Sequence, residues 1–342
     1  MNEVQYRQAT PADDGGIRSL LGRSYPDNVK AAAPFTRWQY WANPFGPTVA
    51  AIGVADGRIV AHWAAVRVPL RVDGALVAGA KGVDIATDPA WRGRGLFAGV
   101  GQQLMAACRE ANIAAVLSHP NPDSARGLER AGGKPVGHVA AYVRPLDDRW
   151  VAQRFHLPQA VATALHRRLS RESEGDTAQV VPLLPPDLDG LWERVQPSVP
   201  HGIVRDSSWW RWRYVNRPSA PYTFVTARRG GQLTGLAAVT VAERFGGAFG
   251  LVLEFLAADR DAARGLTSGL SVAAAERGAV GLAQVAIPGS PVAGLIAAAG
   301  FNRLPKLLEP RPLRFYVTVP EGESTGLAGA SWNMQWGDLD HL

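Results

Sequence analysis

One segment occurs twice in this 342-residue chain, and the repetition limits what the chain can fold into. The first copy reads RWQYWANP from Arg37, and the second reads RWRYVNRP from Arg211. After each copy come two strand-like runs split by a turn pair, Asp-Gly in the first case and Gly-Gly in the second. Such pairs favour tight β-hairpins. The chain therefore repeats a β-rich unit.

The spacing that follows the repeated segment agrees as well. A glycine-containing loop comes 58 residues after Arg37, at Gly95, and 54 residues after Arg211, at Gly265. A glycine-ended helical segment follows 37 and 35 residues later. Matches in this order predict two copies of one αβ unit, each with a mixed sheet. We expect a first domain over 1–150, a connecting helix and linker over 151–176, and a second domain over 177–342.

The chain carries a net positive charge, but its basic residues do not cluster in any one segment. The net charge is +6, yet only four lysines occur and the arginines are scattered. Nucleic-acid tails concentrate their charge, so a nucleic-acid partner is not favoured. Cys108 is the only cysteine, which excludes an internal disulfide and a cysteine metal site. We expect no metal.

No segment reads as a membrane span or a signal peptide. The uncharged stretch 279–301 is interrupted by Pro288 and Pro291, so it predicts a strand, a loop and a short helix. The polar beginning of the chain lacks an apolar signal core. We expect a cytoplasmic protein that does not bind membranes.

The stretch DPAWRGRGLFAGVG from Asp88 places arginine and glycine between a strand and a helix. Apolar residues then recur at helical spacing, at Leu96, Val100, Leu104 and Cys108. Unpaired amides at a helix start, approached through glycine, form an anion site, and arginine forks suit phosphate. A tight turn without a ligand is the alternative. Phosphate is the favoured interpretation.

These residues resemble the coenzyme-binding core of the GNAT (Gcn5-related) N-acyltransferases. The strand GVDIATDP, the loop WRGRGLFAG and the segment NPDSARGLERAGG carry the resemblance over 1–145, and a weaker form covers 178–316. Phe97 departs from the family's last small loop position, as in the multidomain aminoglycoside-acetylating and antibiotic-tailoring branch. The resemblance implies two tandem GNAT-like domains, the second degenerate, and acetyl-CoA or another acyl-CoA as co-substrate. It implies cofactor contacts at Val83, Asp84, Ile85, Arg92, Gly93, Arg94, Gly95, Leu96, Phe97, Ala98 and Asn121.

The resemblance also implies an acyl transfer to an amine, with an acid for the departing thiolate. The family's tyrosine acid is replaced here by Leu128, and Gly133 stands where its phenylalanine is usual. His119 and Tyr142 are the candidates to replace that acid, against the simpler interpretation of an incidental strand-end histidine and a core tyrosine.

The second copy keeps a glycine at 265 but has alanines at 262 and 263 where the first has Arg92 and Gly93. We interpret it as a domain that shapes an acceptor pocket, with Trp38 and Trp212 as candidate aromatic contacts. The C-terminal SWNMQWGDLDHL alternates apolar and polar residues, which predicts a strand ending in an acidic cluster, with a frayed, solvated tail as the alternative. Asp338 would bind a cationic amine, and Asp340 and the carboxylate of Leu342 would accept its proton.

The leading hypothesis is an acyl-CoA-dependent N-acyltransferase that acetylates a small-molecule amine, such as an aminoglycoside-like or other specialised metabolite. A non-catalytic acyl-CoA or nucleotide-binding protein is one alternative. An aminoacyl-tRNA-dependent peptidyl transferase of tandem type is another, because it would suit the basic pI. A homodimer is left open.

Overall fold

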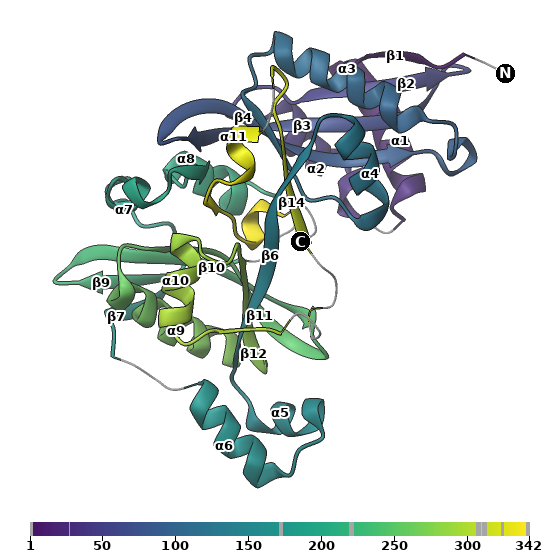
Figure 1. Cartoon of the computed structure of the whole chain (residues 1–342). Helices are drawn as coiled ribbons and strands as arrows, with labels where there is room; N and C mark the ends of the chain where they lie inside the picture. The colour runs from purple at the N-terminus through teal and green to yellow at the C-terminus, as the bar shows by residue number, and fades with distance from the viewer. Residues whose placement is uncertain are drawn as a thin grey trace. The chain divides into compact units, whose positions relative to one another are not determined.

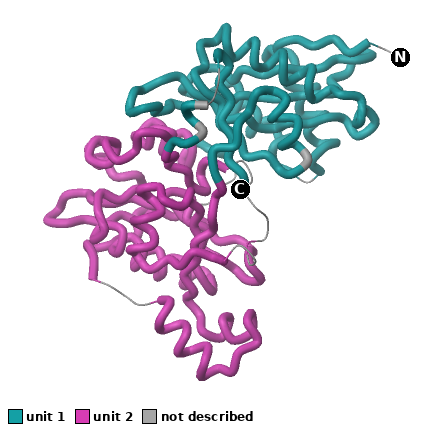
Figure 2. Tube along the Cα trace, viewed as in Figure 1, with its two compact units in different colours: residues 1–137, 216–218, 313–330 teal, residues 138–215, 219–312, 331–342 magenta. Residues whose placement is uncertain are grey.

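The computed structural model describes residues 3–26, 28–170, 174–218, 222–305, 309, 313–322 and 325–339. The chain divides into two compact units, coloured separately in Figure 2. Unit 1 comprises 1–137, 216–218 and 313–330, and unit 2 comprises 138–215, 219–312 and 331–342. Each unit therefore contains segments that lie far apart in the sequence.

The sheet of unit 1 has the strand order β1-β2-β3-β4-β5-β14. The strands β1 to β4 are antiparallel neighbours, β5 is parallel to β4, and β14 is antiparallel to β5. The expected turn at Asp56-Gly57 joins β2 to β3, with both residues at positive φ. The strands are β1 (Gln5–Gln8), β2 (Val49–Ala55), β3 (Arg58–Val72), β4 (Ala75–Thr87), β5 (Ala115–Ser118) and β14 (Leu313–Thr318).

Helix α3 (Leu96–Glu110) packs its apolar face on this sheet. The stripe expected from the sequence is buried, since Leu96, Val100, Leu104 and Cys108 are each at most 4% exposed. The repeated segment forms a π-helix over Arg37–Trp41, directly after the short helix α2 (Ala33–Thr36). The other helices of unit 1 are α1 (Asp14–Ser24), α4 (Pro122–Arg130) and α11 (Thr325–Ala328).

The sheet of unit 2 repeats this order as β7-β9-β10-β11-β12-β6. The four strands β7, β9, β10 and β11 are again antiparallel neighbours, β12 is parallel to β11, and β6 is antiparallel to β12. The strands are β6 (Lys134–Pro145), β7 (Thr177–Val181), β9 (Thr223–Arg229), β10 (Gln232–Arg244), β11 (Gly247–Ala257) and β12 (Gly281–Ala286).

Helix α9 (Arg260–Ala275) packs on the sheet of unit 2 as α3 does in unit 1. The second copy of the repeated segment again forms a π-helix, over Arg211–Val215, after α8 (Ser207–Trp210). A hairpin of α5 (Asp148–Phe155) and α6 (Gln159–Leu169) follows β6 and projects from unit 2 (Figure 1). The remaining elements are α7 (Leu188–Val195), β8 (His201–Ile203), α10 (Pro291–Ala298), β13 (Asn302–Arg303) and β15 (Trp332–Asn333).

The units exchange their last strands. After α4 the chain continues as β6, whose residues from His138 belong to unit 2, where they pair with β12. The corresponding place beside β5 is filled by β14, from the C-terminal part of the chain. Sequence spacing predicts two consecutive domains, whereas strand pairing produces units that share the chain.

The expected mixed α/β fold is confirmed. The uncharged stretch 279–301 forms strand β12 and helix α10, as expected. In the part of the chain that the structure describes, no helix has both the length and the apolar character needed to cross a membrane. The C-terminal segment differs from expectation, since only Trp332–Asn333 is a strand, and it pairs with β8 rather than extending the main sheet.

Candidate functional site

The loop before α3 is open and conformationally specific. Gly93 and Gly95 have φ of 78° and 76°, the left-handed region that favours glycine. Apart from the chain neighbours, no atom of the described residues lies within 4 Å of where a Cβ would be at either position. Asp88 fixes the entry to the loop, since it accepts hydrogen bonds from Ala90 N at 3.0 Å and Arg23 Nε at 2.9 Å. The glycines therefore shape an exposed concave turn.

The backbone amides of residues 92–97 point to an anion site. The structure gives no hydrogen-bond acceptor among the described residues for the amides of Gly95, Leu96 and Phe97, which immediately precede or begin the 15-residue helix α3. Arg94 adds charge beside the loop, with its guanidinium 4.6 Å from the ring centre of Trp91. Unpaired amides, a helix dipole and an arginine together favour binding of phosphate oxygens.

Strands β4 and β5 separate beside this loop. Their parallel pairing runs from Gly79 with Ala115 to Gly82 with Ser118 and ends there. Strand β4 continues to Thr87, so one of its edges is left without a strand partner from Val83 onward. An extended ligand can add to such an edge through backbone hydrogen bonds.

A bulge at Asp84 marks the point of separation. Asp84 has a φ of 53°, and the register between β3 and β4 shifts between His62 and Ala64. A positive φ at a non-glycine residue costs of order 1–3 kcal/mol, and persists only where the surroundings fix it. The bulge is therefore held by specific contacts.

Those contacts surround a buried carboxylate. Asp84 accepts hydrogen bonds from Tyr40 Oη at 2.5 Å and Gln39 Nε2 at 2.8 Å, and pairs with Lys30 Nζ at 2.8 Å. Burial opposes the charge of Asp84, but the Lys30 ammonium and the Tyr40 hydroxyl outweigh it, so its pKa lies below the usual value. His62 Nδ1 lies 2.9 Å from the Asp84 carbonyl oxygen, and burial lowers the pKa of His62. Asp84 is thus an anion in a closed network.

Other residues expected at the cofactor or as the acid are Ile85, Asn121 and His119. The carbonyl of Ile85 accepts a hydrogen bond from Tyr25 Oη, so this group is already occupied. Asn121 caps α4, accepting from Ser124 N at 2.8 Å. His119 directly follows β5, and its ring stacks on Phe315 with centres 5.2 Å apart. These residues all belong to unit 1.

Three further predicted site residues, Trp38, Trp212 and Tyr142, are buried. Trp38 and Trp212 are 8% and 4% exposed, and occupy the same position in the two π-helices. Trp38 packs on Phe35, and Trp212 packs on Trp209. Tyr142 lies on β6 in unit 2, 5% exposed, and burial raises the pKa of its hydroxyl.

The acidic C-terminal segment is anchored by an arginine. Both carboxylate oxygens of Asp338 lie 2.8 Å from Arg205 Nη2. Arg205 is fully buried, and its Nε also donates to Glu254 at 2.7 Å. The carboxylate of Asp338 is therefore committed to the core of unit 2. Asp340 and Leu342 lie outside the described residues.

The loop before α9, the counterpart of the loop before α3, is closed by the chain. The Asp259 carboxylate accepts from the amides of Asp261 and Ala262, at 3.0 and 2.9 Å, where a phosphate would bind. A Cβ at Gly265 would lie 2.3 Å from the carbonyl oxygen of Asp176. This glycine allows close backbone packing and does not approach a ligand.

The strand edge of unit 2 is filled too. The pairing of β11 with β12 ends at Leu251 with Ala283. Beyond it, Phe255 N donates to Gln335 Oε1 at 2.7 Å, and Gln284 Nε2 donates to the same oxygen at 3.0 Å. The C-terminal segment thus occupies in unit 2 the place that is open beside β4 in unit 1.

Sequence reasoning located the loop but not the buried network. Lys30, Gln39, Tyr40 and His62 were missed, although the tyrosine shared by both repeated segments was a usable signal. In unit 2 the counterpart Tyr214 donates to Glu254 at 2.9 Å, so Glu254 does correspond to Asp84. Across the described ranges, no three His, Cys, Asp or Glu side chains are grouped to hold a metal ion.

Comparison with known proteins identifies the fold. Residues 5–132 match the family described as acetyltransferase (GNAT) domain. A probable N-acyltransferase of unknown function from Enterococcus faecalis V583 has a similar structure, with a TM-score of 0.69, 12% identity, and coverage of 94% of this chain and 73% of the other. A GCN5-related N-acetyltransferase from Anabaena variabilis follows, with a TM-score of 0.66, 11% identity, and coverage of 93% and 73%.

Saccharomyces cerevisiae N-myristoyltransferase, solved with bound myristoyl-CoA, is also similar, with a TM-score of 0.60 and 13% identity. It aligns with 93% of this chain and 79% of its own. No curated protein matches the chain by sequence. The likeness in fold to these structures thus extends over nearly the whole chain, beyond the part that the family model matches.

Proposed function

We propose that this protein is an acyl-CoA-dependent N-acyltransferase with one coenzyme site, in unit 1. The observation that carries the proposal is the contrast between the units. Unit 1 has an open loop of unpaired amides beside an open strand edge, whereas Asp259 and Gln335 fill the corresponding places in unit 2. The second unit is then a degenerate copy that binds its own chain in place of a coenzyme.

In this proposal the diphosphate of acetyl-CoA binds the amides of residues 92–97. The pantetheine runs along the edge of β4 beyond Gly82, where the bulge at Asp84 turns backbone groups out of register with β3. The fixed network around Asp84 keeps this edge in one conformation before the ligand arrives, which lowers the cost of binding.

The reaction is the transfer of the acyl group to an amine. The amine nitrogen attacks the thioester carbonyl carbon, a C–N bond forms, and the C–S bond breaks. Backbone amides at the β4 edge stabilise the oxyanion. The departing thiolate takes a proton, and the attacking nitrogen loses one. Leu128 cannot supply that proton, because its side chain is a hydrocarbon, and it is fully buried in the apolar core. We assign the acid role to His119, which directly follows β5 where the pairing of β5 with β4 ends.

The proposed acceptor is an amine on a small molecule, of the aminoglycoside-like or other specialised-metabolite class. The C-terminal Asp340 and Leu342 are the proposed acceptors of the amine proton. This assignment rests on chemistry, because a carboxylate is suited to receive a proton from an ammonium group.

Calorimetry with acetyl-CoA, followed by thiol release with a panel of amines, tests the proposal. Gly95→Trp should abolish binding, because the indole would fill the open loop. Gly57→Trp is the matched control, since Gly57 also has a positive φ and open space around it. Binding of two acetyl-CoA molecules per chain, or no amine-dependent thiol release from any acceptor, contradicts the proposal.

A further inference from the structure

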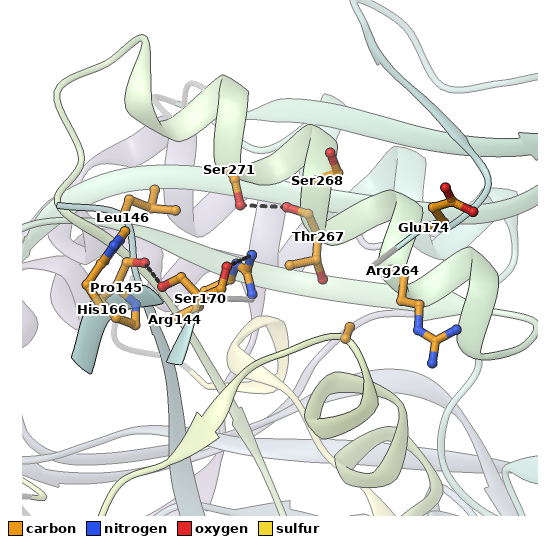
Figure 3. Close-up of a pocket in the computed structure, with 11 residues that line it drawn as sticks. Arg144, Pro145, Leu146, His166, Ser170, Glu174, Arg264, Thr267, Ser268 and Ser271 are labelled. Atoms are coloured by element: carbon orange, nitrogen blue, oxygen red, sulfur yellow. Dashed lines mark hydrogen bonds between the residues drawn. The ribbon is translucent and has the colours of Figure 1, made fainter. Parts of the chain in front are cut away.

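A pocket of about 390 Å³ lies within unit 2, between α9, α6 and the end of β6. Figure 3 shows its polar side chains, which come from all three elements. This volume falls in the range of small-molecule sites. Its main polar lining residues are Arg144, His166, Ser170, Arg264, Ser268 and Ser271.

Three basic side chains line the pocket, with Arg144 and His166 at one end and Arg264 at the other (Figure 3). Arg144 is 6% exposed, and its Nη2 donates to the carbonyl of Ser170 at 2.9 Å, which fixes the orientation of the guanidinium. His166 Nε2 is buried there and has no hydrogen-bond partner among the described residues. Arg264 extends along the opposite side (Figure 3). Glu174 is the single acidic side chain in the lining.

The face of α9 that lines the pocket carries hydroxyl groups. Thr267 Oγ1 donates to the carbonyl of Ala263 at 3.0 Å, and Ser271 Oγ donates to that of Thr267 at 2.7 Å. The hydroxyl of Ser268 forms no hydrogen bond with a described group. The opposite face of α9 is apolar and packs on the sheet. The pocket therefore offers cations and hydroxyl groups beside an apolar part of its wall, formed by Pro145, Leu146 and Ala299.

The wall over this face is specific to unit 2. The α5–α6 hairpin that supplies His166 follows the exchanged strand β6, and the repeated order of elements in unit 1 contains no counterpart. The hairpin does not pack directly onto α9 along its whole length, because the pocket with its basic and hydroxyl-bearing lining lies between α6 and α9.

We propose that this pocket binds a small phosphate monoester. A phosphate group matches the positive charge of Arg144 and Arg264, whose guanidinium groups also donate to the Ser170 carbonyl and to Asp261. The imidazole can donate to the same phosphate, and the hydroxyl groups suit the polar remainder of such a molecule. The site is separate from the loop at residues 92–97 and does not depend on the acyltransferase proposal.

Calorimetry on the full chain with glycerol 3-phosphate as the probe tests this inference. One site per chain is expected, and Arg264→Gln and Ser268→Asp should each weaken binding at least tenfold. Arg260→Gln is the matched control on the same helix, because Arg260 lies outside the pocket, and it should leave affinity unchanged.

The result must also be separated from phosphate binding in unit 1. Arg94→Gln should not change the affinity for glycerol 3-phosphate. The proposal is overturned by loss of binding in Arg94→Gln with retention in Arg264→Gln, or by no binding at millimolar probe. Succinate binding as tight as that of glycerol 3-phosphate would also reject a phosphate site.

Discussion

The hydroxyl of Tyr40 donates a 2.5 Å hydrogen bond to the buried carboxylate of Asp84. The same relationship recurs in unit 2, where Tyr214 donates to Glu254 at 2.9 Å. Both tyrosines come from the π-helix formed by the repeated segment, and both carboxylates lie on the strand that borders the separation of the parallel pair. The repeated sequence thus serves to fix a bulged strand from the side.

Asp84→Asn should destabilise the protein by about 3–5 kcal/mol, because it leaves the buried Lys30 ammonium without its counter-charge. Chemical unfolding of the full chain measures the change. Asp73→Asn is the control, since Asp73 also has a positive φ but lies in an exposed turn. That variant should change stability by less than about 0.5 kcal/mol. Equal effects of the two substitutions would show that the Lys30 pair contributes nothing.

Stability should fall as the pH is lowered from 7.5 toward 5, and His62 should account for part of the slope. Burial lowers the pKa of His62 below the value of 6.5 in the unfolded chain. As the pH falls, the unfolded state therefore takes up a proton that the folded state does not. The free energy of unfolding then decreases by up to about 1.4 kcal/mol per pH unit. His62→Asn should flatten the free energy of unfolding against pH, whereas exposed His156→Asn should not. Parallel slopes in all three proteins would exclude this role.

Gly265→Ala should destabilise unit 2, although alanine is the better helix former. Its methyl group would lie 2.3 Å from the Asp176 carbonyl oxygen, a backbone atom that cannot rotate away. Gly294→Ala in α10 is the matched control, because a Cβ there meets nothing within 4 Å. The control should gain up to about 1 kcal/mol from helix propensity. The comparison is made by thermal unfolding, and an equal gain for Gly265→Ala would refute the tight contact.

Deleting residues 340–342 should lower kcat/KM for the amine at least tenfold, about 1.4 kcal/mol, while the KM for acetyl-CoA stays constant. The deletion removes the proposed proton acceptors but keeps Asp338, so the free energy of unfolding should be unchanged. Steady-state kinetics and unfolding on the same preparation separate the two effects. Wild-type turnover of the true acceptor by the shortened chain would exclude a catalytic tail.

Arg205→Met should cost about 3–5 kcal/mol, because Glu254 and Asp338 would lose the cation between them. Chemical unfolding at neutral pH measures this loss. Arg228→Met is the control, since Arg228 pairs with Asp187 at 2.8 Å on the surface. Exposed pairs contribute about 0–1 kcal/mol. Similar losses in both variants would mean that the buried ion pairs of Arg205 contribute no more to the free energy of unfolding than an exposed pair does.

The repeat, the hairpins and the helix after the glycine loop could be predicted because they depend on local pattern. The stripe from Leu96 to Cys108 and the turn at Asp56-Gly57 are set by neighbours in sequence. The pairing of β14 with β5 could not be predicted, because any apolar strand of suitable length can form backbone hydrogen bonds with the free edge of β5. The same holds for Gln335, whose side-chain oxygen accepts hydrogen bonds from Phe255 N and Gln284 Nε2.

Contacts between residues far apart in the sequence were the other limit on predicting the candidate site. Asp338 and the glycine at 265 were interpreted from their chemistry in isolation, as a ligand group and as the remnant of a phosphate loop. Arg205 binds the first, and Asp176 packs on the second. A residue's role depended here on a partner more than 80 residues away, which composition and spacing do not identify.

The exchanged strands also affect how this protein is made in a cell. A ribosome must synthesise the chain through Thr318 before β14 can complete the first sheet beside β5. Until then the edge of β5 has backbone groups without a strand partner, which invites pairing with other chains. A fragment ending near residue 176 would keep this incomplete edge permanently. Co-expression of two separate halves would instead require each half to supply the final strand of the other.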